Sequence, residues 1–77
     1  MQLNIKYFGL LAELTETNEE QIQFSGSTIS EVLDLLFIKY PELKLKDFKV
    51  AQNQEIVPNE TIVSNEDIAL LPPFSGG

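Results

Sequence analysis

The residues best suited to chemistry stand at the end of the sequence, where positions 70–77 read LLPPFSGG. Pro72 and Pro73 fix the backbone angle φ and favour an extended path. Gly76 and Gly77 have no side chain that could obstruct a narrow channel. We therefore expect an extended tail that presents an unencumbered carboxylate to a partner protein, at a reach on the order of 10 Å. The alternative is an inert, frayed terminus.

The rest of the chain offers no conventional active site. It contains no Cys, His, Arg or Trp. That composition excludes a disulfide framework, a Cys/His zinc site, a histidine-based triad and a thiol nucleophile. The acidic residues are scattered, and we expect the adjacent pairs Glu19-Glu20 and Glu66-Asp67 on the surface. We predict no metal site.

The charge of the chain limits its choice of partners. Twelve acidic residues against five lysines give a net charge of −7 over 77 residues. This balance argues against nucleic acid and against an anionic membrane, and it suits a basic protein partner or simple solubility. No segment has the length of a membrane span or the pattern of a signal peptide, so we expect a cytoplasmic protein.

Alternating apolar and polar residues predict the strands that must position this tail. At 43% apolar residues the chain is long enough for one small core. Leu3, Ile5 and Tyr7 share one face of the first run, which leaves Phe8 on the other face. The predicted strands are residues 2–8, 20–24, 48–52, 55–57 and 68–71, with a short helix over 9–14. The first and last strands are the most apolar, so we place them at the centre of the sheet.

One main helix is predicted between the second and third strands. Thr28 and Glu31 fit a capping box at its start, and Pro41 ends it near Lys39 or Tyr40. Its apolar stripe faces the sheet, and Ile38 points away. We interpret residues 41–47 as a loop.

The sequence resembles the small subunits of molybdopterin synthase, which are ubiquitin-like sulfur carriers. LLPPFSGG is similar to the C-terminal signature of that family, IKYFGLLAEL to its first strand and turn, and VAQNQEIV to its middle hairpin. Asn65 stands where members often have Gly, and Ala12 where many have Arg. The resemblance implies an α+β fold of the β-grasp type, a mixed sheet of about five strands with one main helix packed on one face. It also implies a domain over residues 1–74 and a flexible tail over 75–77.

The resemblance further implies a carrier role in which this chain has no catalytic side chain of its own. A partner adenylyltransferase would use ATP and Mg²⁺ to convert the Gly77 carboxylate to an acyl-adenylate, and a persulfide from a sulfurtransferase would turn it into a thiocarboxylate. Phe74, Ser75 and Gly76 would guide the tail into a channel. The catalytic large subunit, in a heterotetramer with this chain, would use the sulfur to build the dithiolene of molybdopterin. The chain itself would bind no cofactor.

Periodicity also predicts where such partners would dock. If Ile68 and Leu70 face the helix, Leu71 faces outward beside Phe8. Phe8, Leu71 and Phe74 would form an exposed apolar patch beside the tail, and Pro72 and Pro73 would belong to the same docking surface.

Other functions remain open at this point. They are a related carrier for thiamin thiazole or tRNA thiolation, a protein modifier conjugated through Gly77, and a plain interaction module.

Overall fold

The computed structural model describes residues 1–73, and within them the elements follow the predicted order. The strands and helices are β1 (Gln2–Tyr7), α1 (Leu10–Thr15), β2 (Glu19–Gln23), α2 (Ile29–Lys39), the 3₁₀ helix η1 (Pro41–Leu45), β3 (Lys49–Gln52), β4 (Glu55–Ile56) and β5 (Ile68–Leu71).

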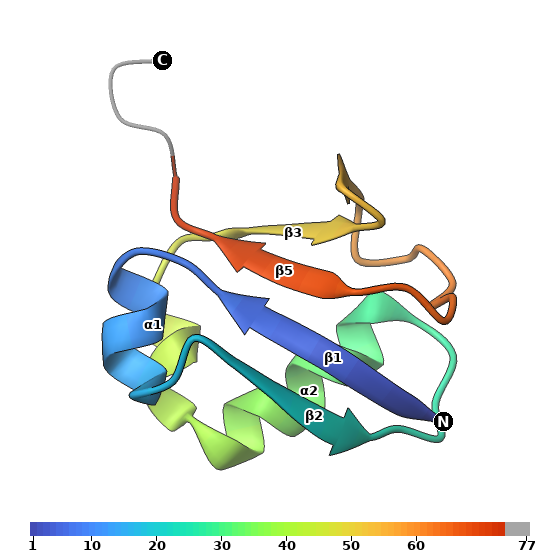
Figure 1. Ribbon diagram of the computed structural model, residues 1–77, viewed down its shortest axis with the longest axis horizontal. Coiled ribbons are helices and arrows are strands. Elements are labelled where there is room, and N and C mark those ends of the chain that lie inside the picture. The colour runs from blue at the N-terminus through green and yellow to red at the C-terminus, as the bar shows by residue number, and fades with distance from the viewer. Residues whose placement is uncertain (74–77) are drawn as a thin grey trace.

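The strands form one mixed sheet in the order β2-β1-β5-β3-β4. β1 pairs with β2 as an antiparallel hairpin and with β5 in parallel, and β5 pairs antiparallel with β3. The first and last strands therefore lie inside the sheet, as predicted, and both edges belong to other strands. Helix α2 covers one face of this sheet (Figure 1). The arrangement is the β-grasp fold expected from the sequence.

The core lies between the sheet and α2. Leu3, Ile5 and Tyr7 of β1 are buried together with Ile68 and Leu70 of β5, because alternate residues of a strand point to the same face. From the helix side, Ile29, Val32, Leu33 and Leu36 enter the same cluster, and Ile38 points to solvent.

Helix α2 begins and ends where its sequence signals predict. The Thr28 hydroxyl accepts from the amide of Glu31, and the Glu31 carboxylate accepts from the amide of Thr28, so the capping box is formed. At the other end Tyr40 leaves helical geometry, with φ −130° and ψ 81°, because it precedes Pro41.

The predicted loop over residues 41–47 is wrong for its first part, which forms η1. Leu43 is fully buried in the core cluster, and its burial holds this single turn against α2. A five-residue turn is too short to show helical periodicity, so only tertiary packing selects it.

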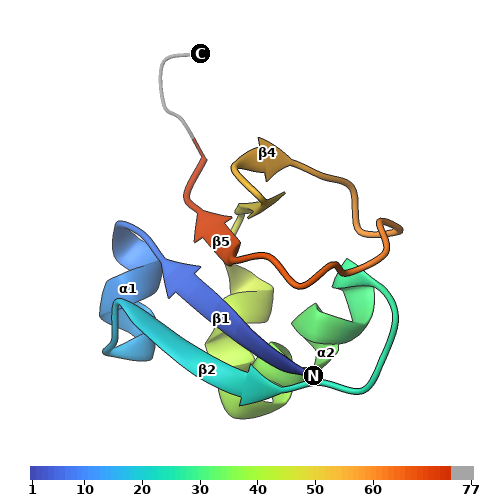
Figure 2. The same cartoon turned by 45° about the vertical axis from the view of Figure 1, so that its right-hand side comes forward.

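Figure 2 shows β4 at the edge of the sheet, away from α1 and β2. Within residues 1–73, no helix is both long and apolar enough to cross a membrane.

Candidate functional site

The predicted site residues that the structure describes lie where β5 ends. Leu71 and Pro72 are half-buried and Pro73 is exposed. Because β5 pairs with both β1 and β3, the chain leaves the sheet from its interior rather than from an edge. The other predicted site residues, namely Phe74, Ser75, Gly76 and Gly77, lie outside the described residues. The predicted boundary between domain and tail, between residues 74 and 75, lies outside them too.

The turn between β1 and α1 packs directly against this exit. The amide of Phe8 donates to the carbonyl of Leu70 at 3.3 Å. Gly9 has φ +58°, and a Cβ atom at this position would lie 3.0 Å from Cγ of Pro72. Glycine at position 9 therefore lets this turn approach Pro72 more closely than a residue with a side chain could.

Phe8 lies on the outer face of the sheet, as its parity in the first strand predicts. Its side chain is 45% exposed, so α1 leaves much of the ring open to solvent. The parallel register pairs Tyr7 with Leu70, which puts Phe8 beside Leu71 one step further along. The structure thus brings together Phe8, Leu71, Pro72 and Pro73, which we call the tail-side surface.

Two leucines that the sequence analysis did not select extend this surface. Leu10 of α1 and Leu45 of η1 are 68% and 83% exposed. With Pro72 and Pro73 they line a shallow hollow of about 290 Å³. For Leu10, one sequence signal indicated an exposed side chain. It adjoins Leu11 in a short amphipathic helix, and one of two adjacent residues there must face outward.

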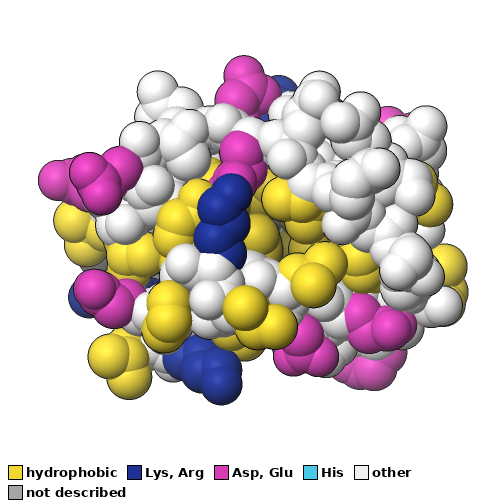
Figure 3. Space-filling view, turned by 90° about the horizontal axis from the view of Figure 1, so that it is seen from below, with side chains coloured by type: hydrophobic (Ala, Val, Ile, Leu, Met, Phe, Trp, Pro, Cys, Tyr) yellow, Lys and Arg dark blue, Asp and Glu magenta, His cyan; other side chains and the backbone are white. Residues whose placement is uncertain are grey.

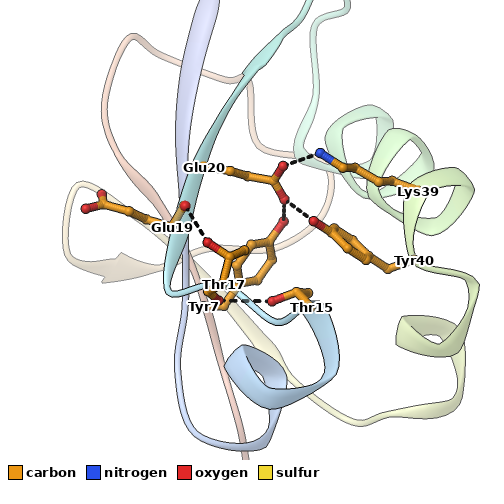
Figure 4. A network of polar contacts seen from close by, with 7 residues as sticks. All are labelled: Tyr7, Thr15, Thr17, Glu19, Glu20, Lys39 and Tyr40. Atoms are coloured by element: carbon orange, nitrogen blue, oxygen red, sulfur yellow. Dashed lines mark hydrogen bonds and ion pairs between the residues drawn. The ribbon is translucent and has the colours of Figure 1, made fainter.

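The pair Glu19-Glu20 was predicted on the surface, and for Glu20 that prediction is wrong. Its side chain is only 14% exposed. It accepts hydrogen bonds from the hydroxyls of Tyr7 at 2.6 Å and Tyr40 at 2.7 Å, and it pairs with Lys39 (Figure 4). Glu20 shares strand parity with the inward residue Ile22, and this signal predicts the inner face.

Burial and three hydrogen-bond partners determine the ionisation of Glu20. Burial alone works to raise the pKa of Glu20, but the hydrogen bonds from Lys39, Tyr7 and Tyr40 outweigh it and lower that pKa. Burial, then the hydrogen bond to Glu20, raises the pKa of Tyr7 above its usual range. The pKa of Tyr40 is raised as well, by burial and then by its hydrogen bond to Glu20. Near neutral pH these shifts favour an ionised Glu20 carboxylate and neutral hydroxyls on Tyr7 and Tyr40. We call these three residues and Lys39 the Glu20 cluster, and its contacts stabilise the fold.

The underside of the molecule, where α2 and β2 lie, exposes apolar side chains among acidic ones (Figure 3). Among residues 1–73, no three metal-binding side chains come together closely enough to hold an ion. Within residues 1–73 the site therefore consists of an exit strand and an apolar surface beside it.

Comparisons with known proteins agree with this arrangement. A family model described as the ThiS family matches residues 5–77. The molybdopterin synthase sulfur carrier subunit of Arabidopsis thaliana is 32% identical over 81 residues, covering 100% of this chain and 84% of that protein.

Two solved structures share the fold. The small archaeal modifier protein 1 of Methanosarcina acetivorans matches with a TM-score of 0.80 at 27% identity, covering 99% of this chain and 96% of that one. A chain in the complex of subunits 1 and 2 of molybdopterin-converting factor from Helicobacter pylori matches with a TM-score of 0.71 at 24% identity, covering 100% of both.

Proposed function

The chain belongs to the ThiS family and is a sulfur carrier of the molybdopterin synthase type, and we propose that it carries the sulfur on the carboxyl group of Gly77. The observation that supports this most directly is the family match, which continues through the Gly-Gly pair at positions 76 and 77. The composition agrees, because no thiol is present elsewhere in the chain to hold sulfur.

A carboxylate must be activated before sulfur can replace its oxygen, because oxide is a poor leaving group. A partner adenylyltransferase, using ATP and Mg²⁺, forms the acyl-adenylate at Gly77 and releases pyrophosphate. The terminal sulfur of a persulfide then attacks the acyl carbon and displaces AMP. A thiol cleaves the resulting acyl disulfide, which leaves the thiocarboxylate on Gly77 and a disulfide on the donor.

This chain contributes positioning to that sequence of steps. Phe74, Ser75 and Gly76 guide the tail into the partner's channel, where a small backbone fits. Phe8, Leu71, Pro72 and Pro73 give the partner an apolar surface at the point from which the tail departs. The catalytic groups, nucleotide and Mg²⁺ belong to the partners.

The receiving partner is the catalytic large subunit of a molybdopterin synthase. The name of the Arabidopsis relative describes that protein as one subunit of such a synthase, and the Helicobacter chain is a subunit in a two-subunit complex. The large subunit would use the sulfur to form the dithiolene of molybdopterin, in a heterotetramer that contains two copies of each chain.

Intact mass spectrometry tests the carrier chemistry. Incubation with the adenylyltransferase, MgATP and a sulfur donor from the same organism should raise the mass by the difference between sulfur and oxygen. A variant that lacks Gly77 should show no rise and should unfold at the same urea concentration, because every helix and strand described lies within residues 1–73. A mass rise that persists without Gly77 would place the sulfur elsewhere.

A protein-modifier function is the second candidate, favoured by the similarity to the archaeal modifier protein. The same activated carboxyl group would then be attacked by a lysine amine of a target. Conjugates of higher mass in cell extracts, absent when Gly77 is deleted, would support it.

A further inference from the structure

Strand β2 forms one edge of the sheet, and its outer side is open to an additional strand. Within residues 1–73 its only partner is β1. At the end of this pair, Met1 and Phe24 exchange both of their backbone hydrogen bonds. Bonded and non-bonded pairs alternate along an antiparallel ladder, so the N–H and C=O groups of Gln21 and Gln23 point away from β1. These backbone groups can pair with an extended segment of another protein.

Helix α2 runs beside this strand in the opposite direction. At one end of β2, Lys39 pairs with Glu20, and at the other end Glu31 and Phe24 line the same hollow. Leu35 lies one turn after Glu31 and one turn before Lys39, so it belongs to the same side of the helix. Its side chain is 42% exposed. An added strand would therefore send its inward side chains over Leu35.

The hollow lies where this side of α2 meets the end of β2. It has a volume of about 430 Å³, and Phe24 and Leu35 provide its apolar part. Gly26 keeps it open, because a Cβ atom there would lie 2.8 Å from both the Glu31 carboxylate and the Phe24 ring. Alternate side chains of a strand point to the same face, so a strand added to β2 can place one of them in this hollow.

The charged side chains that line the hollow are both acidic, namely Glu31 and Asp34. Hydrogen bonds from the amides of Ser27 and Thr28 lower the pKa of Glu31, so its carboxylate is ionised at neutral pH. Both bonds end on Oε1, and within residues 1–73 Oε2 accepts none. Asp34 is exposed one turn further along α2. The hollow can therefore receive a cationic side chain.

Two positive groups lie near the hollow, and each already has a partner. Lys39 pairs with Glu20, and the amino group of Met1 donates to the carbonyl of Phe24. Neither of them lines the hollow. A basic occupant thus meets two acids there on a chain of net charge −7. A second copy of this chain would instead bring like charges together, which disfavours self-pairing at this edge.

The hollow and the tail lie at opposite ends of the sheet. β1 is parallel to β5 and antiparallel to β2, so β2 ends where β5 begins. Figure 1 shows the end of β2 beside the N-terminus, whereas the chain leaves β5 at the other end. A protein bound at the hollow therefore leaves the tail-side surface free.

We propose that the β2 edge and this hollow bind an extended basic segment of a second partner protein, which adds a strand to the sheet. The backbone of the segment pairs with Gln21 and Gln23. One apolar side chain covers Leu35, and a lysine or arginine two positions away reaches Glu31. The spacing fits, because alternate residues of a strand are about 6.6 Å apart and Cβ atoms one helical turn apart are separated by about 5–6 Å. This inference does not depend on the carrier chemistry.

A peptide titration on the full ¹⁵N-labelled chain tests the site. The probe is an octapeptide with threonine at the odd positions and with valine and lysine in turn at the even ones. We expect shifts concentrated at residues 19–24 and 31–38. A matched peptide with glutamate in place of lysine should bind at least about tenfold more weakly, and methylation of the probe's backbone nitrogens should abolish binding. Equal binding by either control, or shifts centred elsewhere, would overturn the proposal.

Proline at position 21 tests the backbone contact. The amide of Gln21 points to the open edge, so Gln21→Pro removes a donor there and leaves the bonds to β1 in place. The variant should bind the probe at least about tenfold more weakly, whereas Gln21→Ala keeps the amide and should bind nearly normally. Normal binding by a folded Gln21→Pro would refute the pairing. Urea midpoints report the fold, and if the proline variant is unfolded the methylated probe decides the same question.

Charge-matched variants separate a local contact from the overall charge. Asp34→Asn should weaken the lysine probe about threefold, as expected for one exposed ion pair. Asp47→Asn removes the same charge beside Pro72 and Pro73 and should change the affinity little. Equal losses in the two variants would show only a general attraction to an acidic protein and would count against the hollow.

Simultaneous binding tests the separation from the tail. Adding the catalytic large subunit of the proposed function should leave the affinity for the probe within about twofold, and displacement of the probe would refute the separate location. Sedimentation identifies the other possible occupant, because a dimer of this chain that Gln21→Pro abolishes would assign the edge to a second copy and overturn the proposal. The mass rise on Gly77 is a separate measurement, and its failure would leave the peptide result unchanged.

Discussion

Replacing Glu20 by alanine should destabilise the domain more than any other loss of a single carboxylate that we consider. The side chain accepts from the hydroxyls of Tyr7 and Tyr40 and pairs with Lys39. Tyr7 is only 2% exposed, so its hydroxyl would be left without an acceptor. An unsatisfied buried polar group costs free energy that a solvated one does not.

The expected size follows from the burial of each contact. A hydrogen bond to a charged acceptor contributes about 1.5–3 kcal/mol when buried, and this applies in full to the contact with Tyr7. The hydroxyl of Tyr40 is half-buried, and we count about half of that amount for it. Lys39 is exposed, so solvent screening leaves its ion pair little net contribution. Together we expect the free energy of unfolding to fall by about 3 kcal/mol.

Urea denaturation at neutral pH, followed by far-ultraviolet circular dichroism, measures this loss. With a slope of about 1 kcal/mol per molar for a small domain, the midpoint should fall by about 3 M. Glu19→Ala is the matched control, because the Glu19 carboxylate accepts one exposed hydrogen bond, from the side-chain amide of Asn4, and the side chain points away from Glu20 (Figure 4). Glu20→Gln preserves the shape of the side chain and should fall between the two. If Glu20→Ala and Glu19→Ala lower the midpoint equally, the reasoning is refuted.

Four further outcomes are expected. Phe8→Asp should weaken binding to the catalytic large subunit at least about tenfold in a titration, since it puts a charge on the apolar tail-side surface, and its urea midpoint should stay near that of the unmodified chain. Stability should decline as pH falls below about 4, because the pKa of Glu20 is lower in the folded state than in the unfolded one, and Glu20→Gln should flatten this acid limb in urea titrations. Above about pH 10 stability should decline again, because the folded state raises the pKa of Tyr7, and Tyr7→Phe should reduce that decline. Thr28→Ala should lower the free energy of unfolding by about 1 kcal/mol, because the helix cap is lost. Ser30→Ala, two residues further along in the first turn of α2, should leave the free energy of unfolding nearly unchanged.

Local signals were sufficient to predict most of the fold. The Thr28 capping box and Pro41 set both ends of α2, and strand alternation identified the inner residues of β1. Predicted strand ends differ from the observed ones by a residue, for example at Phe8, because the ends depend on pairing with neighbouring strands. The Ile68–Leu71 strand was predicted at its observed bounds.

Contacts between distant segments explain what the sequence did not predict. Leu43 packs into the core and Glu20 bonds to residues thirteen to twenty positions away. The pairing of an acid with two tyrosines has no local pattern, although strand parity places Glu20 inward. The exposed Leu45 became notable only when η1 brought it beside Pro72 and Pro73.

Strand β1 connects the Glu20 cluster, on the inner face of the sheet, to the tail-side surface on the outer face. Tyr7 points inward to Glu20, and Phe8, the next residue, points outward to the tail-side surface. Successive residues of an extended chain face opposite ways, so fixing the orientation of Tyr7 also fixes that of Phe8. The Glu20 cluster can therefore affect partner docking only through the position of the β1 backbone, whereas Phe8 contacts the partner directly. It follows that a Glu20 variant that still folds should bind partners with nearly normal affinity, and that Phe8→Asp should lose affinity while its fold is intact.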